Sequence, residues 1–287
     1  MKKLLSLFVL LLSVVLLASC NTEEINNEKL IIGLECGYQP FNWTTNTSSE
    51  FTLPIDGTNQ FADGYDIQIA KYLSKELGKE VVVKKMTWEA LIPALQNGDI
   101  NMVLAGMTDT PKRRESIDFT VPYLESDLAF LIKTENLPEG NSKENPISYE
   151  ELLELFDGKN LICQNTVVGD EFIDTYFANV EGYDIHHNSP ADTYPLAALD
   201  VKSGAAFAMP AELPVIEAMT NLGGLSVLYV DYSFLSADDV NGLSVSIGIQ
   251  KGNTELCEQI NAALAKLSLE QRAEMMGAAA TRSANIQ

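Results

Sequence analysis

Apolar and polar positions along the chain follow two periods, one typical of strands and the other of helices. The short apolar run Leu30–Leu34 predicts a buried strand. In the segment 65–77 the residues Tyr65, Ile69 and Leu77 share one helical face, and the glycine that follows predicts the helix end. A strand at 80–86 and a helix at 88–97 repeat this order. Such alternation favours an α/β fold in which helices flank a mostly parallel sheet, with ligands at the carboxyl ends of its strands.

A candidate binding segment follows the strand predicted at 101–105. Gly106 would let a ligand approach the backbone closely, and Thr108 offers a hydroxyl. Pro111 suits the first turn of a helix, on which Arg113 presents a planar fork that can bind a carboxylate through two parallel hydrogen bonds. These residues indicate capture of a small anion, although a strand–turn–helix whose arginine faces water is the alternative that they leave open.

The same order of strands and helices begins afresh in the second half of the chain. Ser148 and Glu151 form a capping box at the start of its first helix. The polar stretch 42–63 in the first half has no clear period and is expected to be a long loop with at most a small hairpin. We therefore predict two lobes that close on a ligand about a hinge. Lobe 1 would comprise residues 29–130 and 247–287, lobe 2 residues 135–242, and the hinge two segments near 127–134 and 243–250.

The first residues are typical of a processing segment. Lys2 and Lys3 precede an apolar run that is short for a membrane span and suits a signal peptide. The run ends in Leu17-Ala18-Ser19-Cys20, which resembles the lipobox of bacterial lipoproteins. This resemblance implies a signal peptide over residues 1–19, lipid on Cys20 and a polar tether over 20–28, with an ordinary secretory peptide cut nearby as the alternative. Two acyl chains on the cysteine would anchor the protein stably.

Charge and cysteine content exclude several classes of function. The net charge of −21, two units more negative without the signal peptide's lysines, disfavours nucleic acid and anionic lipid as partners. The three further cysteines, Cys36, Cys163 and Cys257, are widely spaced and indicate buried thiols rather than disulfides or a zinc site. His186 and His187 are expected to form an exposed pair at a strand end. We expect no metal and no cofactor.

Five short motifs resemble the polar amino acid-binding family of solute-binding proteins, the receptors of ABC importers, which have a type II periplasmic binding protein-like fold. They occur in the family's order over nearly the whole mature chain: Gly37–Phe41 (GYQPF), Gly64–Ile67 (GYDI), Trp88–Leu95 (WEALIPAL), Met107–Arg113 (MTDTPKR) and Asp118–Tyr123 (DFTVPY). In addition, Pro210–Pro214 (PAELP) is similar to the family's V-V-D-E-P segment.

The resemblance implies a role for each candidate residue. Arg113 and Thr108 would bind an α-carboxylate, and the Gly106 carbonyl would accept from the α-ammonium. Tyr38 and Trp88 would sandwich the ligand side chain, with Glu35 near its far end. Glu212 would pair with the α-ammonium where the family usually has Asp. Val168 replaces a hydroxyl residue of the family's G-T-T turn, so it would contribute only through backbone N–H groups at a helix start.

Structural alternatives remain for four of these residues. Tyr38 and Trp88 could be core aromatics, Glu35 an exposed charge at a strand end, and Glu212 an acidic residue in a helix's first turn.

The resemblance implies an extracytoplasmic, lipid-anchored monomer that binds an L-amino acid and delivers it to the transmembrane subunits of an ABC permease, without catalysis. Two carboxylates against one arginine favour a cationic or neutral polar side chain. The alternatives are a periplasmic enzyme like cyclohexadienyl dehydratase on the same scaffold and the ligand domain of a sensor.

Overall fold

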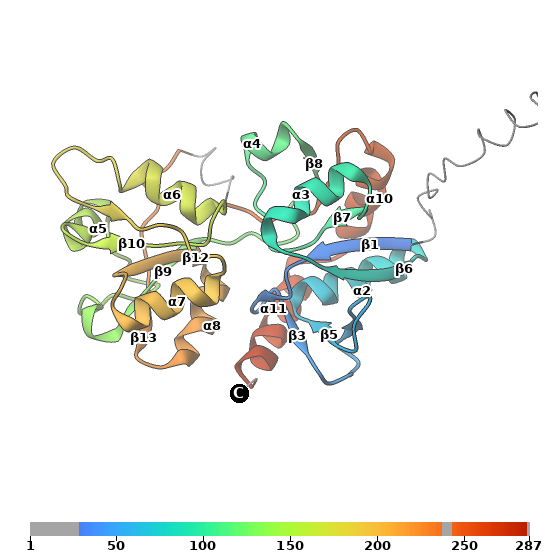
Figure 1. Cartoon of the computed structure of the whole chain (residues 1–287), viewed down its shortest axis with the longest axis horizontal. Helices are drawn as coiled ribbons and strands as arrows, with labels where there is room; N and C mark the ends of the chain where they lie inside the picture. Colours follow the sequence, from blue (N-terminus) through green and yellow to red (C-terminus); the bar gives the residue numbers. More distant parts are fainter. Residues whose placement is uncertain (1–28, 237–242, 286–287) are drawn as a thin grey trace, which may run out of the picture.

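The computed structural model describes residues 29–236 and 243–285 (Figure 1). The predicted signal peptide, Cys20 and the tether lie outside these residues. Within the described ranges no helix is long and apolar enough to cross a membrane. The chain forms two α/β bodies that lie side by side, and the C-terminal helix α11 (Leu269–Ala284) belongs to the one that contains the first strand.

The first body is built on a five-stranded sheet in the order β6-β1-β7-β14-β8. Its strands are β6 (Glu80–Lys85), β1 (Lys29–Leu34), β7 (Met102–Val103), β14 (Gly248–Gln250) and β8 (Ile117–Phe119). Helices α2 (Tyr65–Leu77), α3 (Trp88–Asn97), α4 (Pro111–Arg114) and α10 (Thr254–Leu264) accompany it. Strands β6, β1 and β7 are parallel, whereas β14 is antiparallel to both of its neighbours. Four of the five strands therefore point the same way.

The second body repeats this design with the order β11-β10-β12-β9-β13. Its strands are β11 (His186–His187), β10 (Asn160–Leu161), β12 (Ala208–Glu212), β9 (Leu128–Lys133) and β13 (Leu225–Leu228). Its helices are α5 (Tyr149–Phe156), α6 (Val168–Tyr176), α7 (Tyr194–Ser203) and α8 (Leu213–Met219), with 3₁₀ turns at Thr134–Asn136 and Thr220–Leu222. Here β9 is the reversed strand. In each sheet the reversed strand is the one that enters directly after the chain has crossed from the other body.

The crossing points correct the predicted hinge. Strand β9 comprises most of the first predicted hinge segment, including residues 128–130, which were expected in lobe 1. Its residues 128–132 pair with β12 in the second sheet. The two crossing segments instead meet at Leu124 and Val245, where the Val245 N–H donates to the Leu124 carbonyl at 3.0 Å. The apolar run 128–132 forms an interior strand of the second sheet, between β12 and β13, and all five of its residues are buried. A continuous apolar run marks a buried strand but not the sheet to which it belongs.

The segment expected to be a loop at 42–63 contains most of a small sheet. Its strands β2 (Gly37–Tyr38), β3 (Asn42–Thr45), β5 (Phe61–Asp63) and β4 (Leu53–Pro54) are antiparallel. They are two to four residues long, too short to show a period in the sequence. Arg282 on α11 ties this sheet to the C-terminal helix, since its guanidinium donates to both carboxylate oxygens of Asp63 at 3.0 and 2.8 Å.

Helix ends agree closely with the predictions where capping residues mark them. Gly78 and Gly98 end α2 and α3 in the left-handed conformation. Ser148 forms the predicted capping box at the start of α5. Thr110 caps α4, whose second residue after Pro111 is Arg113. This short helix, together with the strand end before it, fixes where the Arg113 guanidinium lies.

Candidate functional site

A narrow pocket lies between the two bodies, and all eight predicted ligand-binding residues line it. Its lining comprises Glu35, Tyr38, Trp88, Gly106, Thr108 and Arg113 from the first body and Val167, Val168, Tyr194 and Glu212 from the second. Most of these residues follow the carboxyl ends of strands, which is where an α/β sheet binds ligands. The pocket brings together the side chains that the sequence placed far apart.

Arg113 is the cation of the pocket. Its Nη1 donates to the Thr108 carbonyl at 2.7 Å, and its Nη2 donates to the Thr166 carbonyl of the second body at 3.2 Å. The guanidinium carbon lies 5.2 Å from the centre of the Trp88 ring. Burial lowers the pKa of Arg113, but a guanidinium stays charged at neutral pH. Arg113 is therefore a fixed positive charge with a planar fork, suited to a carboxylate.

Gly106 brings the backbone close to the pocket. Its φ is +62°, and a Cβ at this position would lie 2.9 Å from Cε1 of Tyr38, so only glycine fits without strain. Its N–H donates at 3.0 Å to the Tyr123 hydroxyl, which donates in turn to Asp66 at 2.7 Å. Asp66 is fully buried, and this burial raises its pKa to about 8. These hydrogen bonds engage the N–H of Gly106 and leave its carbonyl for other partners.

Glu212 is the most buried carboxyl of the pocket, with 2% of its surface exposed. It ends β12 and accepts a hydrogen bond from the Tyr38 hydroxyl of the opposite body. Burial raises its pKa, against the hydrogen bond from Tyr38 and the charge of Arg113, which lower it. A buried carboxyl whose pKa is raised pairs well with an ammonium group or holds a transferable proton.

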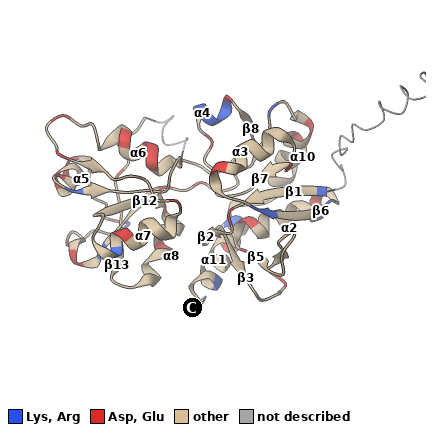
Figure 2. Cartoon of the chain, in the orientation of Figure 1, with Lys and Arg blue, Asp and Glu red and all other residues tan. Residues whose placement is uncertain are grey.

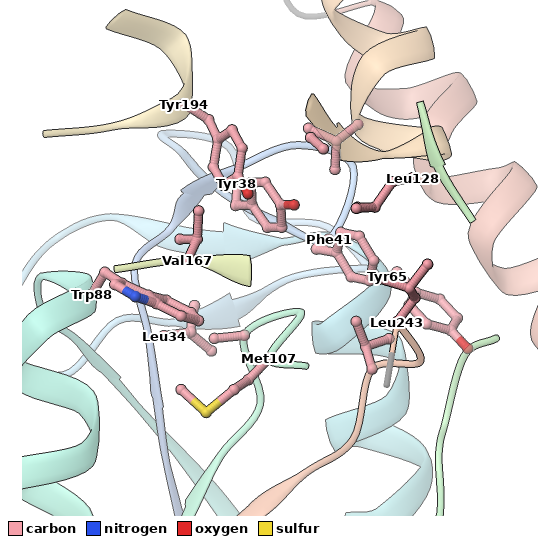
Figure 3. Packing of buried hydrophobic residues seen from close by; sticks show 14 of the residues in the cluster. Leu34, Tyr38, Phe41, Tyr65, Trp88, Met107, Leu128, Val167, Tyr194 and Leu243 are labelled. Atoms are coloured by element: carbon pink, nitrogen blue, oxygen red, sulfur yellow. The ribbon is translucent and has the colours of Figure 1, made fainter. Parts of the chain in front are cut away.

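Tyr38 does not form an open clamp opposite Trp88. Phe41 and Tyr194 both stack on its ring, with centroids 5.3 and 4.6 Å away (Figure 3). Its hydroxyl faces Glu212, so Tyr38 orients this carboxyl across the two bodies. Trp88 keeps the position that the sequence predicted, at the start of α3, with its Nε1 3.4 Å from the Thr166 carbonyl.

Val168 is the first residue of α6, so its N–H is among those that have no partner within the helix. The turn before it contains Thr166, whose φ of +60° is unusual for a residue with a side chain. Asp170 stabilises this turn, because its Oδ2 accepts from the Thr166 N–H at 3.1 Å. The helix start thus offers N–H groups to an anion in the pocket.

Glu35 lies at the end of β1, where Gln164 of the second body donates to its Oε1 at 3.1 Å. Burial raises the pKa of Glu35 to about 7, and the Gln164 hydrogen bond partly opposes this. Glu35 is half-buried rather than an exposed strand-end charge. At neutral pH it is poised between its two protonation states.

Sequence reasoning missed Tyr194 and Gln164. Tyr194 begins α7 and lines the pocket, and its N–H donates at 3.0 Å to the buried amide of Gln164. In the structure both residues lie beyond the carboxyl ends of strands of the second sheet, Gln164 after β10 and Tyr194 after β11, which is where a ligand site is expected. Gln164 links Tyr194 to Glu35 and therefore positions two walls of the pocket at once.

The two bodies are in direct contact around the pocket. Tyr38 with Glu212, Glu35 with Gln164 and Arg113 with Thr166 each join one body to the other. At the rim, Lys112 of α4 pairs with Glu171 of α6 at 2.9 Å. Figure 2 shows the basic residues of α4 and the acidic residues of α6 on the same side of the molecule. The pocket is therefore closed on several sides by polar contacts.

The cysteines and histidines outside the pocket differ in how they match the predictions. Cys36, Cys163 and Cys257 are free thiols, the first two of them buried. His187 is not an exposed residue, because only 12% of its side chain is accessible and it pairs with Asp170 and Asp174. Among the described residues no group of three or more His, Cys, Asp or Glu side chains is placed to hold a metal ion.

Known proteins similar to this chain are mostly binding proteins. The arginine-binding extracellular protein ArtP of Bacillus subtilis is 31% identical over 140 residues, which span 47% of this chain and only half of that protein. A putative ABC transporter arginine-binding protein of Escherichia coli is 25% identical over 252 residues, 88% of this chain and 90% of the relative.

Solved structures show the same fold. An amino acid ABC transporter substrate-binding protein of Streptococcus pneumoniae bound to L-arginine has a TM-score of 0.71 at 20% identity, covering 90% of this chain and 97% of the other. An ancestral amino acid-binding protein, a precursor of cyclohexadienyl dehydratase, has a TM-score of 0.68 at 25% identity, covering 89% and 97%. The type II periplasmic binding protein fold predicted from the sequence is confirmed.

The family assignment follows from the extent of the match. The model of the bacterial extracellular solute-binding proteins of family 3 matches residues 30–276, which include both sheets and every residue of the pocket. The chain therefore belongs to family 3 of the bacterial extracellular solute-binding proteins.

Proposed function

We propose that this protein is the receptor of an ABC importer and that it binds an L-amino acid with a cationic side chain in the pocket between its two lobes. The observation that carries the proposal is the charge content of the pocket, whose lining includes one cation, Arg113, and two carboxyls, Glu35 and Glu212. No bond is made or broken. The ligand shifts the equilibrium between open and closed lobes by its greater affinity for the closed form.

The three charges of an arginine-like ligand match the three charged groups of the pocket. The α-carboxylate would bind Arg113, Thr108 and the N–H groups at the start of α6. The α-ammonium would bind Glu212 and the Gly106 carbonyl. The distal cation would then lie at Glu35 beside the Trp88 ring, which also attracts cations. A neutral side chain would leave Glu35 without a counter-charge, and an acidic one would be repelled by it.

The relatives support this choice of ligand, since two of them are named as arginine-binding proteins and a solved neighbour holds L-arginine. We further propose that Cys20 carries lipid that anchors the mature protein to the outer face of the cell membrane. The polar segment 20–28 would tether it within reach of the permease. The protein would act as a monomer.

The test is a thermal-shift screen of the mature chain against the twenty L-amino acids, L-citrulline and prephenate. A ligand at 100 times its dissociation constant adds about 2.7 kcal/mol of stability, which is readily measured. We expect a clear shift with L-arginine or L-lysine that is lost in Arg113→Ala. A shift with L-glutamate but not with cationic amino acids would contradict the assigned charge match.

An enzyme on the same scaffold is the second candidate. The observation that favours it is Glu212, a buried carboxyl whose raised pKa would let it donate a proton to a leaving group. A solved neighbour, an ancestral amino acid-binding protein, is a precursor of cyclohexadienyl dehydratase, which supports this candidate. Turnover of prephenate, abolished in Glu212→Gln, together with no response to any amino acid, would establish the enzyme instead of the receptor.

A further inference from the structure

A chain of polar contacts runs from His187 to the edge of the pocket. His187 ends β11, and its imidazole lies between two carboxylates of α6. Its Nδ1 is 2.8 Å from Oδ1 of Asp174, and its Nε2 is 3.1 Å from Oδ1 of Asp170. The other oxygen of Asp170 accepts from the Thr166 N–H at 3.1 Å. Asp170 thus connects the imidazole to the turn that precedes α6.

The Thr166 turn is a contact point between the two lobes. The Thr166 carbonyl accepts from Nη2 of Arg113 at 3.2 Å and lies 3.4 Å from Nε1 of Trp88. Its left-handed backbone conformation, with φ of +60°, costs free energy for a threonine and persists only where neighbouring groups hold it. Asp170 is such a neighbour. The orientation of Asp170 therefore bears on the two first-lobe residues proposed to bind ligand.

We infer that His187 is a positioning residue of the binding site: through Asp170 it holds the Thr166 turn in the conformation that meets Arg113 and Trp88. The expected effect on ligand affinity rests on the proposed function, whereas the link between the imidazole and Thr166 does not depend on any ligand. Asp174 serves to orient the imidazole toward Asp170.

The charged groups around His187 decide its protonation. Asp170 and Asp174 face it from α6, and on its own strand His186 turns instead to Asp184, 3.4 Å away. Lys159, next to the neighbouring strand β10, lies over the Phe207 ring. The close contact with Asp170 raises the pKa of His187, burial opposes this, and Asp174 raises it further. At pH values below this raised pKa the imidazole of His187 is protonated, and its charge holds Asp170 in place. As the pH rises through the pKa, the imidazole loses its charge.

The first arm of the test is the dissociation constant of L-arginine, measured by calorimetry at pH 6.0 and pH 8.5 for the mature chain, His187→Gln and His186→Gln. Because the ion pair with Asp170 is lost, we expect His187→Gln to weaken binding about tenfold at pH 6.0 and only about twofold at pH 8.5. The exposed neighbour His186 is the matched control and should change neither value. Equal weakening at both pH values would reduce His187 to a structural residue and overturn the inference.

The second arm needs no ligand. The backbone amide signal of Thr166, followed by NMR between pH 5 and 9, should titrate with the same pKa as the His187 imidazole, and should stop doing so in Asp170→Asn. A Thr166 amide that does not follow the imidazole would overturn the inference, even if His187→Gln does not fold. If the unmodified chain fails to bind L-arginine while Thr166 still follows His187, the proposed function fails and the link between His187 and the turn stands.

Discussion

The affinity for L-arginine should rise with pH because Glu35 must be ionised to pair with the distal cation. Burial raises the pKa of this carboxyl to about 7. At pH 5.5 only about 3% of Glu35 would be ionised before binding, and at pH 8 about 90%. If the bound cation returns the pKa of Glu35 to its ordinary range, affinity should fall by about 30-fold from pH 8 to pH 5.5, or about 2 kcal/mol.

The assay is isothermal titration of L-arginine and L-citrulline into the mature chain and into Glu35→Gln at several pH values. L-Citrulline has nearly the shape of L-arginine but no distal charge. Its affinity should therefore depend much less on pH through Glu35. In Glu35→Gln the extra pH dependence of L-arginine should disappear. Any pH dependence that arises from Asp66, His187 or Glu212 is shared by the two proteins and cancels in the ratio of their dissociation constants.

Two results would refute this reasoning. If L-arginine and L-citrulline bind with the same pH dependence, Glu35 does not face the distal group. If Glu35→Gln binds L-arginine with the unmodified pH dependence, another carboxyl carries the effect. A buffer series with different ionisation enthalpies gives an independent check, because binding of L-arginine near pH 6 should release close to one proton from Glu35.

Three further predictions follow from single contacts. Arg113→Ala should weaken binding by at least about 30-fold, since it leaves a carboxylate without its partner, whereas Arg114→Ala on the same short helix should leave the dissociation constant unchanged. Gly106→Ala should lower the free energy of unfolding, measured by urea denaturation, by about 2 kcal/mol or more through strain and overlap with Tyr38. Gly78→Ala, which has a similar φ but open space around it, should lower it by about 1 kcal/mol. Equal losses would refute the overlap. Arg282→Ala should cost about 2 kcal/mol in the same assay because it leaves a mostly buried carboxylate of β5 unpaired, and a loss below about 0.5 kcal/mol would show that the pair is dispensable.

The sequence predicted long helices and their ends well because local groups determine them. Gly78 can adopt a left-handed conformation at little cost, and Ser148 satisfies free N–H groups of the first turn, so both mark helix ends wherever the helix packs. The two- to four-residue strands of the small antiparallel sheet left no comparable signal. The small sheet at 37–63 is held by pairing between segments and by Arg282 from the far end of the chain. Such contacts are not visible in a local pattern.

Within the site, the eight candidate residues came from motifs, and their meeting in one pocket required the fold. The motifs could not show that Phe41 and Tyr194 would cover the ring of Tyr38, nor that Gln164 would reach Glu35 from the other lobe. These contacts depend on the distance between lobes, which no local sequence specifies. The same holds for His187, whose carboxylate partners lie on the helix packed beside its strand rather than on the strand itself.

The polar groups proposed to bind ligand already contact one another across the lobes. The Tyr38 hydroxyl donates to Glu212, Gln164 donates to Glu35, and Arg113 donates to the Thr166 carbonyl. A ligand placed between them replaces part of this set, so its affinity is the difference between the contacts it makes and those it displaces. Only a ligand with three suitable charges offers stronger partners to both carboxyls and to Arg113 at once. A ligand that lacks one charge would leave a buried group with a poorer partner than before, which costs more than the lost contact alone. Selectivity would thus come from the contacts between the lobes as much as from the shape of the pocket.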